Sequence, residues 1–156
     1  GGQTPADGTV ATASYSGGTT NMAAGNNAST IGLDASIFTV TSIQTGDQYA
    51  NHVGLNKSGQ IRLYSDKATG NGNTLEIKVA AGYVITGIEI SFDASTATTG
   101  QLFLDMVTSE LAASDIVSTS LVRNDLNITS FGLKNTNTEV SGQIWITSIK
   151  ITYKAA

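Results

Sequence analysis

Residues 73–92, NTLEIKVAAGYVITGIEISF, contain two runs in which apolar and polar side chains alternate along the chain. The apolar positions that share a face are Leu75, Ile77 and Val79 in the first run and Val84, Ile88, Ile90 and Phe92 in the second. Alternation with a period of two is typical of half-buried β-strands, and the dipeptide at 81–82 suits a tight turn. We predict a β-hairpin that pairs Val79 with Val84 and leaves Ile85 on the outer face.

The pattern continues on both sides of this stretch. Upstream, residues 61–64, IRLY, alternate in the same way, and Asn71-Gly72 suits a turn with positive φ. We therefore predict a meander of three strands over 61–92. Further strands are predicted at 9–15, 37–43 and 101–107, and short helices within 21–33 and 108–115.

The closing run, residues 143–153, also alternates, but its apolar positions change parity once. The apolar side chains of this run are Ile144 and Ile146 in one parity and Ile149, Ile151 and Tyr153 in the other. One extra residue in a β-bulge near Thr147-Ser148 would return all five to the core while bending the strand. A second bent strand is predicted over 126–133, where Leu126 and Ile128 precede Phe131 and Leu133 in the opposite parity.

Composition supports an all-β fold. Only 13% of the 156 residues are charged, against about a quarter in an average soluble domain. Thr, Gly, Ser and Asn fill the polar positions instead, whereas the surface positions of long helices are normally rich in Glu, Lys, Arg and Gln. We predict a single two-sheet, jelly-roll-like β-sandwich over 9–156, with one or two short helices and a flexible leader at 1–8.

Charge and missing residue types exclude several classes of function. A net charge of -4 argues against binding to nucleic acid or to an anionic membrane surface. No apolar run reaches eighteen residues, so no membrane-spanning helix is predicted. The sequence contains no Cys and one histidine, His52, which excludes thiol nucleophiles and zinc sites with several imidazoles. His52 lies in a polar loop, where an exposed structural role is favoured.

One pair of carboxylates deserves comparison with a glycosidase site. In the predicted hairpin, Glu76 and Glu89 are diagonal neighbours on the outer face, roughly 7–8 Å apart. This distance overlaps the spacing of roughly 6.5–9.5 Å between the two carboxylates of inverting glycosidases. Lys78 shares the face, however, and nothing there would raise the pKa of one carboxyl group. The sequence therefore favours a solvated sheet face and no catalytic activity.

A metal site is left open. Five aspartates lie near predicted strand ends or loops, where carboxylate oxygens could converge on Ca²⁺: Asp66, Asp93, Asp105, Asp115 and Asp125. Their spacing does not form a calcium loop of the Asp-x-Asp-x-Asp-Gly type. One structural Ca²⁺ is thus an alternative to a protein with no cofactor, and no metal ligand is assigned.

Several segments carry a family resemblance: VGLN at 53–56, IRLY at 61–64, GNTLEI at 72–77, GYVITGI at 82–88 and the closing run at 143–153. Together they resemble a β-sandwich accessory domain of secreted and surface proteins from Gram-positive bacteria and mollicutes. The closing run is also loosely similar to jelly-roll carbohydrate-binding modules. The likeness spans about 37–153 and implies an extracellular module. It implies no site residues, because its motifs specify turns and core faces.

Trp145 is the most informative candidate for a site. Its parity opposes Ile144 and Ile146, which places the indole on the outer face, and Arg62 and Tyr64 oppose their own apolar neighbours in the same way. An aromatic ring beside planar polar groups can stack on a sugar ring while its neighbours bind the hydroxyls. The alternative is an indole covered by a loop, by a helical segment or by another subunit.

These observations lead to two functional hypotheses. The first is a non-catalytic extracellular module, secreted or on the cell surface, that binds glycan or another surface polymer through Trp145, Tyr64 and Arg62 and so serves adhesion. A surface rich in Thr, Ser, Asn and Gly is common in bacterial proteins of this setting. The alternative is a structural subunit that self-associates through exposed strand edges and its polar N-terminal segment, because few charges guard those edges.

Overall fold

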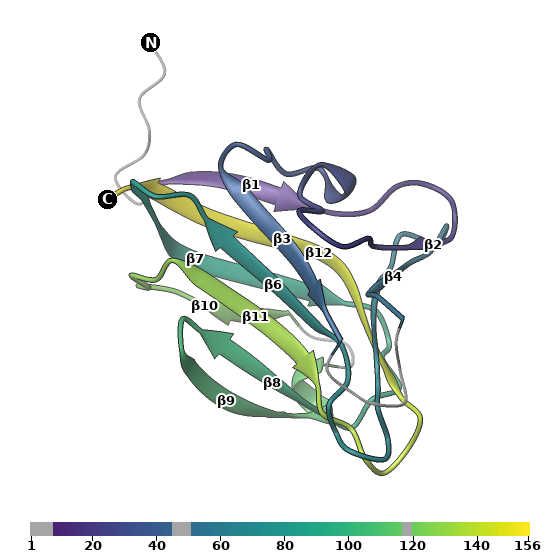
Figure 1. Ribbon diagram of the computed structural model, residues 1–156. Coiled ribbons are helices and arrows are strands. Elements are labelled where there is room, and N and C mark those ends of the chain that lie inside the picture. Colours follow the sequence, from purple (N-terminus) through teal and green to yellow (C-terminus); the bar gives the residue numbers. More distant parts are fainter. Residues whose placement is uncertain (1–7, 45–50, 117–119) are drawn as a thin grey trace.

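The computed structural model describes residues 8–44, 51–116 and 120–156 and shows an all-β sandwich of two antiparallel sheets (Figure 1). This confirms the predicted fold class. Residues 1–7 of the predicted leader lie outside the described residues. In the part of the chain that is described, no helix has the length and apolar character needed to cross a membrane.

The seven-stranded sheet is built around the long closing strand. Its strands are β1 (Thr9–Ala13), β2 (Thr20–Asn21), β4 (Gly54–Leu55), β5 (Ile61–Tyr64), β7 (Tyr83–Phe92), β10 (Leu121–Arg123) and β12 (Gln143–Ala155). They follow the order β10-β7-β12-β5-β4-β2, and β1 also pairs with β12. One edge of β12 pairs with β5 at its first residues and with β1 at later ones. The other edge of β12 pairs with β7 from Ile146 onward.

The five-stranded sheet covers the other side of the core in the order β3-β6-β11-β8-β9. Its strands are β3 (Phe38–Ile43), β6 (Thr74–Val79), β8 (Thr99–Leu104), β9 (Val107–Ala112) and β11 (Ser130–Asn135). Among the described residues, the helical elements are the short 3-10 helix η1 (Ser29–Ile31) and the single-turn α1 (Ala113–Ile116). The predicted helix at 108–115 is therefore mostly wrong, because residues 108–112 pair with β8 instead.

The predicted bulge in the closing strand is confirmed. The register of β12 against β7 shifts between Ile146 and Ser148, which leaves Thr147 as the extra residue. The apolar side chains on both sides of the bulge then enter the core: Ile144, Ile146, Ile149 and Ile151 are at most 1% exposed, and Tyr153 packs against them. β12 thus contributes one continuous apolar face to the centre of the sandwich.

The predicted hairpin is wrong, although both of its strands exist. β6 lies in the five-stranded sheet and β7 in the seven-stranded sheet, so the chain crosses the core between them (Figure 1). β6 already has β3 on one edge and β11 on the other, which leaves no edge for β7. β5 also lies in the seven-stranded sheet, so the predicted three-stranded meander is wrong for the same reason.

Two parity assignments also change. The register between β7 and β12 shifts where Thr152 pairs with Gly87 and Tyr153 with Ile85, so β7 contains an extra residue. This bulge turns Ile85 into the core, where it is fully buried, and leaves Val84 half-buried. The predicted bent strand over 126–133 is a crossover: Ile128 bridges to Ile85 in one sheet, and β11 begins two residues later in the other.

Candidate functional site

The outer face of β5 and β12 brings the predicted site residues together. In the register of these two strands, Trp145 lies opposite Arg62, and Gln143 lies opposite Tyr64. The alternating residues, Ile61, Leu63, Ile144 and Ile146, are all fully buried in the core. The four side chains Arg62, Tyr64, Gln143 and Trp145 therefore share the outer face, and we call them the aromatic face.

Trp145 is half-buried and takes part in three hydrogen bonds. Its indole Nε1–H donates to Oε1 of Gln143 at 2.7 Å, which links two members of the aromatic face. Its backbone N–H donates to Oγ of Ser95 at 2.9 Å, and its carbonyl accepts the N–H of Asp93 at 3.0 Å. The segment after β7 thus flanks β12 on the side away from β5. The indole lies on the predicted face, partly covered, with an orientation set by these hydrogen bonds.

Tyr64 lies over a glycine that was not identified from the sequence. Gly54 of β4 pairs with Arg62, and a methyl group added to Gly54 would collide with the Tyr64 hydroxyl. A glycine inside a strand often marks such a close approach, which is the signal that could have identified it. The Cζ atom of Arg62 lies 5.6 Å from the centroid of the Tyr64 ring, within the range of a cation–π interaction.

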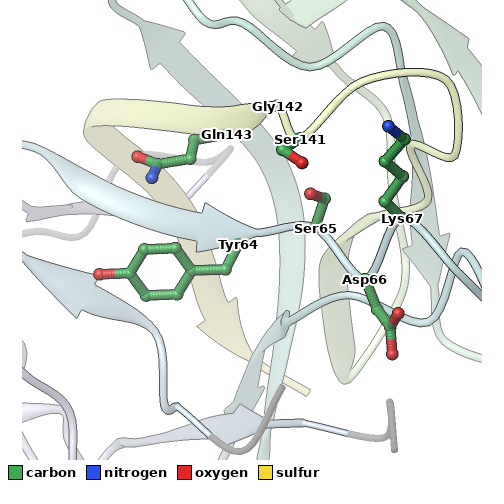
Figure 2. A pocket seen from close by; sticks show the side chains of 7 residues that line it. All are labelled: Tyr64, Ser65, Asp66, Lys67, Ser141, Gly142 and Gln143. Carbon is green, nitrogen blue, oxygen red and sulfur yellow. The ribbon is translucent and has the colours of Figure 1, made fainter. Parts of the chain in front are cut away.

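A pocket of about 420 Å³ adjoins the aromatic face (Figure 2). Its lining comprises Tyr64, Ser65, Asp66, Lys67, Ser141, Gly142 and Gln143, which come from the end of β5, the loop after it and the start of β12. In Figure 2 the side chains of Tyr64 and Gln143 extend in the same direction, whereas those of Lys67 and Asp66 point opposite ways. The pocket therefore continues the aromatic face past the end of β5.

The loop residues of this pocket carry no pattern that distinguishes them in the sequence. Asp66 was considered only as one of five calcium ligands; it is 2% exposed, and its Oδ1 accepts the Ala68 N–H at 3.2 Å. Its Oδ2 is buried without a hydrogen-bond partner. No three His, Cys, Asp or Glu side chains among the described residues gather into a group that could hold a metal ion. The predicted Ca²⁺ stays a prediction.

The carboxylate pair considered for glycoside hydrolysis is not assembled. Glu76 lies on β6 of the five-stranded sheet and Glu89 on β7 of the seven-stranded sheet, both with outward parity. They therefore lie on opposite faces of the sandwich, and the predicted separation of 7–8 Å is wrong. Glu89 instead forms an ion pair with Lys150 of β12, with 3.8 Å between Oε2 and Nζ.

His52, predicted to be exposed, is half-buried. Its Nδ1 lies 3.1 Å from Oγ of Ser42, and its Nε2 lies 3.3 Å from Nε2 of Gln44. The Ser42 hydroxyl also accepts the backbone N–H of Val53 at 2.8 Å. The imidazole thus contacts β3 through a serine and an amide, and these contacts connect the chain before β4 to the five-stranded sheet.

Comparison with known proteins adds no family to this description. Neither a scan against protein-family models nor a search of the curated proteins finds a match to this sequence. The case for function therefore rests on the aromatic face and the pocket beside it.

Proposed function

We propose that this chain is a non-catalytic extracellular module that binds glycan, and so serves adhesion, through the aromatic face and the adjoining pocket. One observation carries the proposal: the register of β5 and β12 places Trp145 beside Arg62 and Gln143 beside Tyr64 on one outer face. Parity along each strand alone predicts an outward position for three of these residues, Trp145, Arg62 and Tyr64.

The chemistry of the four side chains suits a sugar. A pyranose ring has apolar C–H faces and a rim of hydroxyl groups, and Trp and Tyr offer large apolar area with few rotamers. Arg62, Gln143 and the hydroxyls of Ser65 and Ser141 supply hydrogen-bond donors and acceptors around that area. The binding groups lie mainly on paired strands, which hold side chains more rigidly than loops do.

Glycan-array screening of the intact chain, followed by Trp145→Ala, tests the proposal. We expect the substitution to abolish binding to the glycans that the native chain binds on the array, because the main stacking surface is lost. Trp145→Phe should keep part of the affinity, since a smaller aromatic ring remains. A small loss of melting temperature is expected in Trp145→Ala, because the indole is half-buried on the outer face.

Phe103→Ala provides the matched control. Phe103 is also half-buried, and it lies on the outer face of the other sheet, opposite Gly132 of β11. This variant should bind glycan as the native chain does. Retained binding in Trp145→Ala, or equal losses in the two variants, would contradict the assignment of the site.

One further observation favours the alternative function, a self-assembling structural subunit. β9 is an edge strand of six residues that pairs only with β8 among the described strands. It contains a single charge, Glu110, and no Lys or Pro. Its first residue, Val107, is 69% exposed, and Met106 in the turn before it is 94% exposed. Such an edge can add a strand from another chain.

Light scattering on the full chain and on Val107→Lys separates the two functions. If the β9 edge joins copies, the native chain should form oligomers and the variant should be monomeric with its glycan binding unchanged. A native chain that is monomeric over the whole concentration range would remove the alternative.

A further inference from the structure

The aromatic face contains a positive charge that no described protein group neutralises. Arg62 is half-buried, and its Nε is shielded from solvent without a hydrogen-bond partner. Among the described residues the ion pair found is Lys150 with Glu89, so no described carboxylate pairs with this guanidinium. A charge that is partly desolvated and unpaired costs stability, because lost hydration is not replaced by an opposite charge.

Two acidic residues, Asp66 and Asp93, adjoin the pocket and the aromatic face, and neither forms an ion pair with Arg62. Asp93 adjoins Trp145 at the edge of β12 away from β5, where its backbone N–H donates to the Trp145 carbonyl. Its carboxylate accepts hydrogen bonds from Nε2 of Gln60 and from the backbone N–H of Ala94. Asp66 is buried, and its side chain points away from that of Lys67 (Figure 2).

A second cation lies at the other end of the site. Lys67 is exposed and lines the pocket next to Tyr64. From Trp145 past Arg62 and Tyr64 to Lys67, the surface therefore combines two aromatic rings with two cations. Asp93 lies beside Trp145, and the buried Asp66 lines the pocket beside Lys67. The unpaired guanidinium of Arg62, together with Lys67, favours a ligand that carries negative charge.

We infer that the glycan is acidic: a polysaccharide containing uronic acid, whose carboxylate pairs with Arg62 while a neighbouring sugar ring stacks on Trp145. This inference rests on the proposed function and adds the class of sugar. A carboxylate supplies the charge that Arg62 lacks, and hydrogen bonds between ionised partners are roughly twice as strong as neutral ones. Lys67 provides a second, more mobile point charge for the next acidic unit of the polymer.

Binding is measured to polygalacturonate and to the same polymer after complete methyl esterification, which removes the charge and keeps the sugar ring. The same comparison is made for a panel of other uronate-containing polysaccharides, each with its carboxyl-reduced counterpart. We expect at least one acidic polymer to bind about tenfold or more tightly than its neutral counterpart. Its affinity should fall as the ionic strength rises from about 0.05 M to about 0.5 M.

Variants then locate the charge that is responsible. Arg62→Gln should lower the affinity for the acidic polymer by about 10- to 100-fold and make acidic and neutral forms bind alike. Arg62→Lys should restore part of the difference, and Lys67→Gln should have a smaller effect. Lys78→Gln removes one exposed cation from the other sheet and should change nothing. Melting temperatures identify any variant whose loss of binding reflects unfolding.

The outcomes separate this inference from the proposed function. Equal binding of acidic and neutral forms, with binding lost in Trp145→Ala, would overturn the acidic ligand and leave glycan binding in place. Binding only to sulfated glycans would also overturn the carboxylate assignment. If no glycan of any class binds, both the inference and the proposed function are wrong.

Discussion

Two connections in this molecule are both short and both contain a residue with positive φ, yet they join strands in different ways. β8 and β9 are joined by Asp105 and Met106 and pair as a hairpin within one sheet. β6 and β7 are joined by Ala80, Ala81 and Gly82, yet they lie in different sheets. Each connection contains one residue with positive φ, Asp105 at 54° and Gly82 at 92°. A short connection with a residue of positive φ is therefore compatible with both pairing and crossing.

The difference lies in the faces of the strands and in their free edges. β6 and β7 each carry a full apolar face, and both of these faces enter the core between the sheets. β9 buries only Leu111 and leaves its other residues exposed, so it cannot contribute half of a core. It can, however, extend a sheet at its edge. β8 pairs with β11 on one edge, and its other edge accepts β9. Strands with strong apolar faces are sorted between sheets, and polar strands are added at edges.

The largest expected difference between the two connections is a distance. Spin labels at Glu76 and Glu89, on β6 and β7, should lie roughly 20 Å or more apart, because two sheets about 10 Å apart separate outward-facing positions. In a hairpin the same pair would be about 7–8 Å apart. Labels at Gln101 and Glu110, which are paired in the β8–β9 hairpin, provide the short reference distance. A short distance for the first pair would disprove the crossing between sheets.

The next largest effect concerns stability. Ile88 of β7 is 3% exposed, and Ile88→Ala should lower the free energy of unfolding by about 2–5 kcal/mol, because it leaves a cavity between the sheets. Val107→Ala in β9 should change it by about 0.5 kcal/mol or less, since Val107 is 69% exposed. Glu89→Ala, one position along from Ile88, should also have a small effect. Denaturant unfolding measures all three, and similar losses at Ile88 and Val107 would contradict the distinction between core and edge strands.

The smallest effect tests the connection itself. Gly82 has a φ of 92° and no atom within 4 Å of an added Cβ, so Gly82→Ala should cost about 1 kcal/mol through backbone strain alone. Gly18→Ala meets the same open space without a positive φ and serves as the control in the same unfolding experiment. A cost near zero at Gly82 would mean that the crossing does not require this left-handed conformation.

The aromatic face shows how far local pattern can lead toward a site. Alternation placed Trp145, Arg62 and Tyr64 on outer faces, and the structure confirms this placement and pairs two of the three directly. Gly54 and the pocket residues from two loops could not be found in the same way. Their positions depend on which strand lies beside β5, and a loop residue has no periodicity from which its direction can be predicted.

The sequence by itself determined most of the strands, most of the side chains that enter the core, and the place of the bulge at Thr147, because these properties follow from polarity at neighbouring positions. It did not identify β9, which lacks a full apolar face. The second bulge, near Thr86, escaped this reasoning because both Val84 and Ile85 are apolar, and either parity satisfies the pattern. Only the tertiary structure decided the partners of each strand. An apolar strand face can be buried equally well in either sheet of the sandwich. The sheet that a strand joins therefore depends on which strand edges are already paired with strands distant in sequence and which are still free.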